Sequence, residues 1–254
     1  MRLQEKAERL ARDGLFLGGP ARDFEAAGRL QLIALLRVGL HPDSKVVDIG
    51  CGCLRGGYWL IHFLDPGCYF GIEPATEMLE AGAKDLLEQD VREQKRPRLD
   101  TNADFDTSIF GVKFDFFLAR SVWTHASKSQ IRSMLDSFGR DAGPAGVFLT
   151  SYLPAGMAHP GVRAARRPIW RRLRRRLARL RRRKREAPHP RDYQGDGWSP
   201  ELVHHSIDWV RRECHRRGLS VAELEEDRFN DQVWLLIKRS DLSPQGSSSQ
   251  EPGP

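Results

Sequence analysis

The residues VVDIGCGCLRGG at positions 46–57 carry the strongest structural signal in this 254-residue chain. A short apolar run enters a turn with two glycines, Gly50 and Gly52, and a helical pattern follows. Glycine permits a tight turn and a close approach of a ligand to the backbone, and the N-terminus of a helix favours negative charge. A dinucleotide fingerprint needs a third glycine where Arg55 stands, and the Gly-Lys-Ser/Thr of a P-loop is missing. The turn therefore predicts a nucleotide-like ligand of another class.

Strands and helices alternate on both sides of this turn, which predicts a parallel sheet covered by helices on both faces. One predicted helix carries an apolar face at helical spacing, formed by Leu30, Ile33, Leu36 and Leu40. The predicted strands are 45–49, 68–72, 98–100, 113–119, 146–152, 219–223 and 232–238. The predicted helices are 2–13, 23–38, 55–64, 75–89, 128–138 and 200–217.

Charge and cysteine content restrict where the protein works. The chain has 41 Lys and Arg against 34 Asp and Glu, but residues 163–185 alone hold 13 Arg and Lys184 and no acid. Without them, 27 bases face 34 acids, so the rest of the chain is mildly acidic. Four irregularly spaced cysteines suit a reducing compartment. The charged start lacks the apolar segment of a secretory signal, and no apolar run is long enough to span a membrane. We expect a cytoplasmic protein, at most peripheral to a membrane.

Two acids mark the ends of the first two strands. Asp48 lies within an apolar strand, where a carboxylate is costly unless it receives hydrogen bonds. It either caps the glycine turn or, together with the N–H groups of that turn, binds a ligand ammonium. Glu73 ends the next strand, 23 residues after Gly50, where open α/β sheets place an acid that binds ribose. S-adenosylmethionine carries an ammonium, a carboxylate, a ribose and an adenine, and Pro74 could pack against the adenine.

The segments DIGCGCLRGG, YFGIEPATEML and KFDFFLARSVWTH together resemble the class I S-adenosylmethionine-dependent methyltransferase family over roughly residues 40–152. They are most similar to bacterial members whose loop reads Gly-Cys-Gly-x-x-Arg-Gly-Gly. The resemblance implies a Rossmann-like, doubly wound α/β sheet, mainly parallel with an antiparallel last strand, and S-adenosyl-L-methionine as cofactor. Many members have a further glycine where this chain has Leu54, which implies a different loop path.

The resemblance also implies which residues contact the cofactor. Near adenine N6 the candidates are Asn102, Asp104 and the backbone of Phe105, of which we favour the last two. The expected contacts are Asp48, Gly50, Cys51 and Gly52 for the methionyl end, Glu73 for the ribose, Pro74, Asp104 and Phe105 for the adenine, and Arg120 for the methionine and sulfonium.

A hydroxyl acceptor benefits from a general base within hydrogen-bond reach. His125 follows the fourth strand at the sheet edge where substrates bind, and it either acts as this base or orders the loop. Tyr152 and His159 are weaker candidates, and His204-His205 falls on a predicted helix and suits a structural role. The pair of Cys51 and Cys53 lacks a second pair of metal ligands, so no metal is predicted.

The Arg-rich run carries an apolar stripe of Ile169, Trp170, Leu173, Leu177 and Leu180. Such a basic amphipathic helix fits an anionic membrane surface, nucleic acid or a protein partner, and a solvated insertion is the simplest alternative.

These observations predict five segments and one function. The function is methyl transfer to a small-molecule, glycan or glycolipid acceptor, with oxygen as the preferred acceptor atom. The alternatives are an RNA methyltransferase that uses the Arg-rich helix and a non-catalytic cofactor-binding adaptor of a membrane or protein. The segments are an N-terminal helical cap at 1–40, a cofactor-binding core at 41–153, the Arg-rich insertion at 154–198, the C-terminal part of the core sheet at 199–240 and a disordered tail at 241–254.

Overall fold

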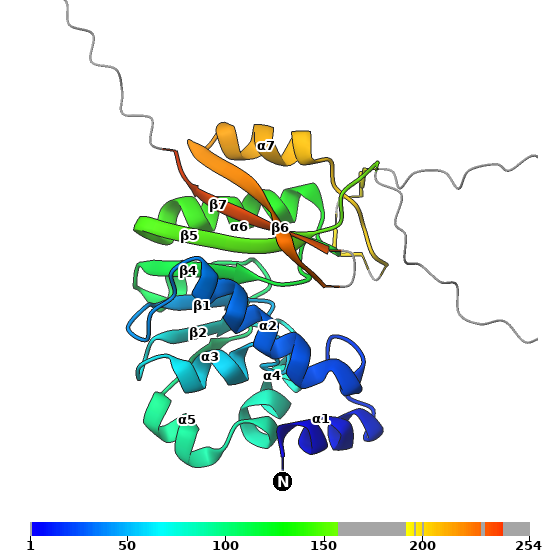
Figure 1. Cartoon of the computed structure of the whole chain (residues 1–254), viewed down its shortest axis with the longest axis vertical. Coiled ribbons are helices and arrows are strands. Elements are labelled where there is room, and N and C mark those ends of the chain that lie inside the picture. Colours follow the sequence, from blue (N-terminus) through cyan, green and yellow to red (C-terminus); the bar gives the residue numbers. More distant parts are fainter. Residues whose placement is uncertain (1, 157–191, 196, 200, 230–231, 241–254) are drawn as a thin grey trace, which may run out of the picture.

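A computed structural model describes residues 2–156, 192–195, 197–199, 201–229 and 232–240. Seven strands form one sheet in the order β3-β2-β1-β4-β5-β7-β6 (Figure 1). The strands β1 to β5 pair in parallel, and β7 is antiparallel to both β5 and β6. The expected mainly parallel sheet with an antiparallel last strand is confirmed. The strands are β1 (Val46–Ile49), β2 (Tyr69–Ile72), β3 (Arg98–Asp100), β4 (Phe114–Ala119), β5 (Ala142–Tyr152), β6 (Leu219–Phe229) and β7 (Gln232–Arg239).

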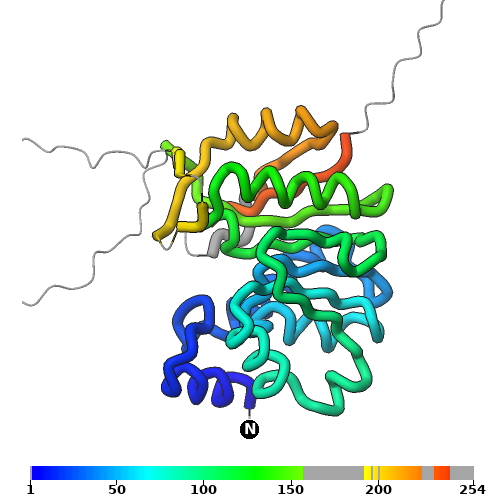
Figure 2. Tube along the Cα trace, turned by 180° about the vertical axis from the view of Figure 1, so that it is seen from behind, coloured from blue at the N-terminus to red at the C-terminus, as the bar shows by residue number. Residues whose placement is uncertain are grey.

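Helices cover both faces of the sheet. The helices α2 and α3 lie on one face, and α6 and α7 lie on the other, as the two opposite views show (Figures 1 and 2). The α-helices are α1 (Leu3–Arg12), α2 (Phe24–Arg37), α3 (Gly57–Phe63), α4 (Thr76–Ala81), α5 (Gln89–Lys95), α6 (Lys128–Asp141) and α7 (Ile207–His215). Three short helical turns accompany them, η1 (Ala21–Asp23), η2 (Gly82–Leu86) and η3 (Ser108–Phe110).

Two predicted helices differ from the structure. The helix expected at 75–89 divides into α4 and the π turn η2, and α5 follows as a separate helix. The helix expected at 200–217 begins only at Ile207, because His204 and His205 pair as extended backbone with Asp192 and Pro154. Ser206 then caps the helix by accepting a hydrogen bond from the N–H of Trp209.

The apolar face predicted for α2 is wrong in part. The side chains of Ile33 and Leu36 are 39% and 41% exposed. The buried face instead includes Gly28 and Gln31, which pack against the glycine turn that precedes α3. Close packing on this turn selects small residues, so hydrophobicity alone does not reveal the buried face.

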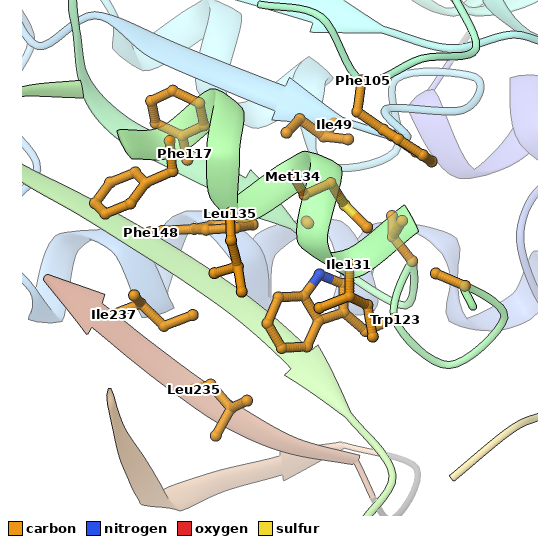
Figure 3. Packing of buried hydrophobic residues seen from close by; sticks show 14 of the residues in the cluster. Ile49, Phe105, Phe117, Trp123, Ile131, Met134, Leu135, Phe148, Leu235 and Ile237 are labelled. Carbon is orange, nitrogen blue, oxygen red and sulfur yellow. The ribbon is translucent and has the colours of Figure 1, made fainter. Parts of the chain in front are cut away.

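The core between the sheet and α6 fixes the ends of the strands that carry the site. Phe117 of β4 packs edge-to-face on Phe114 and Phe138, with ring centroids 5.4 and 5.2 Å apart. Figure 3 shows Phe117, Phe148 and Trp123 in this cluster, near Leu235 and Ile237 of β7. Since these side chains are fully buried, the loop after β4 has a rigid base.

In the part of the chain that the structure describes, no helix has both the length and the apolar character of a membrane span. Among the same residues, no three His, Cys, Asp or Glu side chains gather in a way that could hold a metal ion.

Candidate active site

The glycine turn after β1 depends on left-handed backbone. Gly50 and Gly52 have φ of 71° and 56°, and a Cβ atom on Gly50 would lie 2.6 Å from Cγ2 of Val122. Leu54 also has a positive φ, 61°, and its side chain is buried. A non-glycine residue in this region costs on the order of 1 kcal/mol, and burial of the leucine side chain offsets that cost. Residue 54 thus takes a backbone conformation that favours glycine, even though a leucine occupies it.

Glu73 lies at the carboxyl end of β2 and faces this turn. Its Oε2 accepts a hydrogen bond from the N–H of Gly52 at 3.0 Å, and its Oε1 accepts one from the N–H of Ala75 at 2.9 Å. A carboxylate has about four acceptor positions, so these two bonds orient the group and leave it able to accept from two hydroxyls. The geometry suits the vicinal hydroxyl groups of a ribose.

Asp48 is buried below the turn, on the side of the sheet that α3 covers. It accepts a hydrogen bond from the Tyr69 hydroxyl at 2.9 Å. The N–H groups of Gly50 and Cys51 instead donate to the carbonyl of Ile72, and that of Gly52 donates to Glu73. Burial raises the pKa of Asp48 to about 7, although the Tyr69 hydrogen bond lowers it. Tyr69 is therefore a donor that the sequence did not reveal.

Cys51 has a packing role in the turn. A Cβ atom on Gly71 would lie 2.9 Å from its Sγ, so strand β2 approaches the thiol closely. Burial and the nearby Asp48 raise the pKa of the Cys51 thiol well above its usual range, which keeps it protonated.

The predicted adenine residues lie beyond the ends of β2 and β3. Pro74 and Asp104 are exposed. Phe105 is buried with a φ of 59°, and its carbonyl accepts a hydrogen bond from Oγ of Ser137 at 2.8 Å. Asn102 bonds to Asp100 and to the backbone of residue 106, and so orders the loop.

A cavity of about 220 Å³ lies beside the glycine turn. Its lining brings together the loop at 18–20, helix α2, the turn before α3, the segment after β4 and the start of β7. Two of the predicted site residues, Arg120 and His125, line it. The carboxyl edge of the sheet thus holds both the Glu73 carboxylate and this cavity.

Arg120 projects from the end of β4 toward β5 and β7. Its Nη1 donates to Oγ of Ser121 at 2.8 Å, to Oγ of Ser151 at 2.9 Å and to the side-chain carbonyl of Gln232. Its guanidinium also lies over the Trp234 ring, 5.2 Å from the centroid. Burial and the positive charge of Arg55 lower the pKa of Arg120 to about 10.

His125 is held in one orientation. Its Nδ1 lies 2.9 Å from the carbonyl oxygen of Ser199, and the N–H of Ser199 donates to the carbonyl of His125 at 2.8 Å. Because a carbonyl only accepts, Nδ1 carries the proton in the neutral ring and Nε2 keeps its lone pair. The ring stacks on Trp198 with centroids 5.3 Å apart. This geometry combines an ordered ring with an available basic nitrogen.

The weaker catalytic candidates lie elsewhere. Tyr152 is buried in β5, and its hydroxyl donates to Glu223 at 2.6 Å. His205 is buried, and its Nε2 lies 3.0 Å from the carbonyl of Ala126. His159 falls outside the described residues, as does the Arg-rich run at 163–185.

Arg55 is a site residue that the sequence motif contained but did not assign. Its Nη2 donates to the carbonyl of Leu17 at 2.6 Å, and its guanidinium lies 5.5 Å from the centroid of the Phe24 ring. A Cβ atom on Gly19 would lie 2.9 Å from the same Nη2, so a side chain there would displace the Arg55 guanidinium. The paired glycines at 18–19 are the sequence signal for this contact, and they bring the N-terminal segment to the cavity.

A second cavity, of about 300 Å³, lies between the end of α1 and helix α4. Asp13, Glu77, Glu80 and Asp85 line it together with Lys84. It contains none of the predicted site residues.

The fold matches solved methyltransferase structures. No protein-family model and no curated protein matches the sequence. The crystal structure of magnesium protoporphyrin IX methyltransferase (ChlM) from Synechocystis PCC 6803 with bound SAH is 16% identical at a TM-score of 0.53, over 93% of this chain and 94% of that one. The glycopeptide N-methyltransferase MtfA is 17% identical at a TM-score of 0.56, over 85% and 90%. The sugar N-methyltransferase KedS8 from Streptoalloteichus sp ATCC 53650 is 13% identical at a TM-score of 0.58, over 88% and 90%. The chain has the fold of these methyltransferases.

Proposed function

We propose that this protein is an S-adenosylmethionine-dependent methyltransferase that methylates an oxygen atom of a small-molecule, glycan or glycolipid acceptor. The observation that carries the proposal is the Glu73 carboxylate, fixed by the N–H of Gly52 at the same sheet edge as the cavity that His125 lines. The shared fold supports it, since ChlM has been crystallised with SAH and MtfA with S-adenosylmethionine. The loop sequence also resembles that of the bacterial subgroup with Gly-Cys-Gly-x-x-Arg-Gly-Gly, to which we propose the chain belongs.

The residues around the glycine turn fit the parts of the cofactor. The Glu73 carboxylate would accept hydrogen bonds from the two ribose hydroxyls. The turn formed by Gly50, Cys51 and Gly52 would allow the methionyl end to approach the backbone. Asp48 would supply negative charge below the turn once the methionyl ammonium favours its ionised form, since burial alone raises its pKa to about 7. Pro74 and the loop at Asp104 and Phe105 would contact the adenine, and Arg120 would line the methionine and sulfonium.

Methyl transfer then requires that the acceptor oxygen be positioned and that one base accept its proton. When bound, the cofactor would supply an electrophilic methyl carbon, which the acceptor oxygen can attack in line as the carbon–sulfur bond breaks and S-adenosylhomocysteine leaves as a thioether. His125 accepts the hydroxyl proton of the acceptor at Nε2 while Ser199 holds Nδ1–H, so the oxygen gains nucleophilicity as it attacks. Leu153 and Leu202 line the same cavity and give it apolar surface.

Calorimetry with S-adenosylhomocysteine tests the cofactor assignment. Glu73→Ala removes a charged hydrogen-bond acceptor and should weaken binding by about 1.5–3 kcal/mol, roughly 10-fold to 150-fold. Glu77→Ala, an exposed acid in the first turn of α4, is the matched control and should bind like the wild type. Unchanged affinity in a folded Glu73→Ala variant contradicts the ribose assignment.

Kinetics test the base. After an acceptor is found by screening with labelled cofactor, His125→Ala should lower the rate of the chemical step by about 10²–10⁴-fold. Its affinity for S-adenosylhomocysteine should stay within a few-fold of wild type. A comparable rate loss in Trp198→Ala, which keeps the imidazole but removes the ring stacked on it, would indicate that orientation dominates. A rate near that of the wild type in His125→Ala would show that His125 is not the general base.

A further inference from the structure

The loop that carries His125 is held by a part of the chain that lies far from it in sequence. This part comprises the described residues from 192 to 206, drawn in yellow beside the start of α6 in Figure 2, and we call it the anchoring segment. It donates hydrogen bonds to the carbonyl groups of three consecutive loop residues. The bonds are Val203 N–H to Thr124 at 2.8 Å, Ser199 N–H to His125 at 2.8 Å and Nε2 of His205 to Ala126 at 3.0 Å. Because a loop has no ladder of its own to satisfy these carbonyls, the anchoring segment fixes its path.

His205 acts in this contact as a donor and not as a base. Its side chain is fully buried, and burial lowers its pKa, so the ring is neutral at pH 7. Since the carbonyl of Ala126 only accepts, the proton of the neutral ring lies on Nε2. The buried imidazole thus ties the anchoring segment to the residue that follows His125.

An ion pair fastens the anchoring segment to α6. Nζ of Lys128, the first residue of α6, donates to Oδ2 of Asp192 at 2.6 Å. Oδ1 of the same carboxylate accepts a hydrogen bond from the N–H of Ser206 at 3.0 Å. The two side chains of the pair are 17% and 27% exposed, so salt and water screen it less than a surface pair. One carboxylate therefore holds both ends of the anchoring segment to a residue three positions after His125.

The place of Lys128 in its helix indicates that the ion pair is needed there. A cation at the N-terminus of a helix is unfavourable, because the helix dipole is positive at that end. The first turn of α6 has no acidic side chain to compensate the charge. The carboxylate of Asp192 compensates it from outside the helix. The lysine is thus explained by its contact with the anchoring segment and not by the stability of α6 alone.

A second cation of α6 provides a comparison. Arg132 lies 3.1 Å from the carboxylate of Glu213 in α7. Lys128 and Arg132 both lie over the ring of Trp209, 5.4 and 5.6 Å from its centroid. The two cations share a helix and an aromatic neighbour, but only Lys128 pairs with the anchoring segment. They therefore separate a contact that holds two helices together from one that holds the loop of His125.

We propose that Lys128 and Asp192 are positioning residues that orient the ring of His125 through the anchoring segment. Neither side chain lines the cavity, whereas His125 does. The carbonyl of Ser199 that accepts from Nδ1 of His125 belongs to the anchoring segment, so the tautomer and the direction of Nε2 depend on where that segment lies. A general base must lie within hydrogen-bond reach of the proton that it accepts. The inference rests on the proposed function for the role of His125 and adds the residues that set its orientation.

Nitrogen-15 NMR of the imidazole rings at pH 8 tests the orientation of His125. It is recorded on the full-length protein with and without S-adenosylhomocysteine, and a spectrum of His125→Gln identifies the signals of His125. We expect the wild type to show a proton on Nδ1. Asp192→Asn and Lys128→Met should each show a mixture of the two tautomers, because the Ser199 carbonyl is no longer held in place.

Two further variants are the controls of this measurement. Lys128→Arg retains the charge and should restore the wild-type signals. Arg132→Met removes the other cation over Trp209 and its ion pair with α7, and it should also leave the His125 signals unchanged. Lys128→Met removes a cation that the helix dipole disfavours, so it decides the question if Asp192→Asn does not fold.

The rate of methyl transfer is the second readout. With an acceptor found by screening with labelled cofactor, Asp192→Asn and Lys128→Met should each lower kcat about tenfold or more, since small misplacements of a reacting group are costly. Their affinity for S-adenosylhomocysteine should stay within a few-fold of wild type. The double variant should be no slower than the slower single variant, because both changes remove the same interaction.

The outcomes separate the inference from the proposed function. If the variants lower only the melting temperature, and leave the tautomer of His125 and kcat unchanged, the ion pair is merely structural and the inference is wrong. If the tautomer changes but His125→Ala keeps the wild-type rate, the positioning is correct and the base assignment of the proposed function fails. If S-adenosylhomocysteine does not bind at all, the proposed function fails, and the spectra recorded without it still decide whether Lys128 and Asp192 orient His125.

Discussion

At the scale of a residue, the Asp48 carboxyl shows how a buried acid depends on a donor from the neighbouring strand. Its place in an apolar strand before two glycines predicted a buried carboxylate that needs hydrogen-bond donors. The donor is the Tyr69 hydroxyl, one strand away in β2. That contact depends on the register of the two strands, in which Asp48 lies opposite Gly71, two residues beyond Tyr69 in β2. The register is set when the two strands pair in the folded sheet, so the sequence of either strand alone does not predict it.

The pKa of Asp48 leads to a prediction about stability and pH. In the folded state the carboxyl is protonated up to about pH 7, whereas in the unfolded chain it ionises near 3.8. The unfolded state therefore binds fewer protons between these values, and the free energy of unfolding should fall as pH rises from about 4 to 7. The decrease approaches about 1.4 kcal/mol per pH unit and ends above pH 7. Denaturant unfolding of the wild type and Asp48→Asn, compared at each pH, isolates this slope from other groups.

Tyr69→Phe provides the complementary measurement. Loss of the hydroxyl should cost about 1–3 kcal/mol at pH 8, where Asp48 is ionised, and less at pH 5, where it is neutral. An equal cost at both pH values, or a slope that persists in Asp48→Asn, would show that another group causes the pH dependence.

At the scale of the element, strand positions followed from short apolar runs, and the helical spacing located most helices. The buried face of α2 did not follow, because it is set by contact with the glycine turn rather than by hydrophobicity. A Cβ atom on Gly28 would clash with the carbonyl oxygen of Arg55, and one on Gly56 would clash with the amide of Gln31. The glycines of the loop motif thus serve helix packing as well as ligand approach.

Gly28→Ala tests this contact between α2 and the turn. The added methyl group must separate α2 from the turn, so we expect a loss of about 1–3 kcal/mol of stability and weaker binding of S-adenosylhomocysteine. Gly139→Ala in α6 is the matched control. No atom lies within 4 Å of a Cβ atom there, and alanine should stabilise that helix by about 0.5–1 kcal/mol. Thermal unfolding and calorimetry of both variants measure these effects. Unchanged stability in Gly28→Ala would show that α2 does not pack closely on the turn.

At the scale of the whole molecule, the parallel sheet explains why part of the site was predictable. The carboxyl ends of parallel strands meet at one edge, so the turn after β1, Glu73 after β2 and His125 after β4 had to lie near one another. The segment at 17–20 and the start of β7 also reach this edge, but they are far from the motif in sequence. No local sequence pattern predicts that Gln232 lies against Arg120 or that Gly19 lies against Arg55. Their contribution depends on how the chain ends fold back over the sheet.

The Arg-rich run at 163–185 lies outside the described residues, but the structure describes the chain up to residue 156 and again from residue 192. Pro154 and Asp192 pair with the adjacent residues His205 and His204, on opposite sides of the same extended backbone. Two strands that flank a third are about 10 Å apart. If residues 163–185 are deleted, the 12 residues that remain at 157–162 and 186–191 can span up to about 40 Å. The core can therefore tolerate the deletion.

This deletion tests whether the run binds an anionic membrane, one of the roles that its sequence fits. The variant should keep its affinity for S-adenosylhomocysteine and a melting temperature within a few degrees of wild type, since shortening the connection between residues 156 and 192 changes its closure entropy only slightly. It should lose binding to anionic vesicles, because the remaining chain has more acids than bases. In the full-length protein, salt should weaken vesicle binding, and Trp170→Ala should weaken it further at any salt, since apolar burial is not screened. Vesicle binding that survives the deletion would place the membrane contact elsewhere. Tight, salt-sensitive RNA binding that the deletion abolishes, without any vesicle binding, would favour a nucleic-acid acceptor instead.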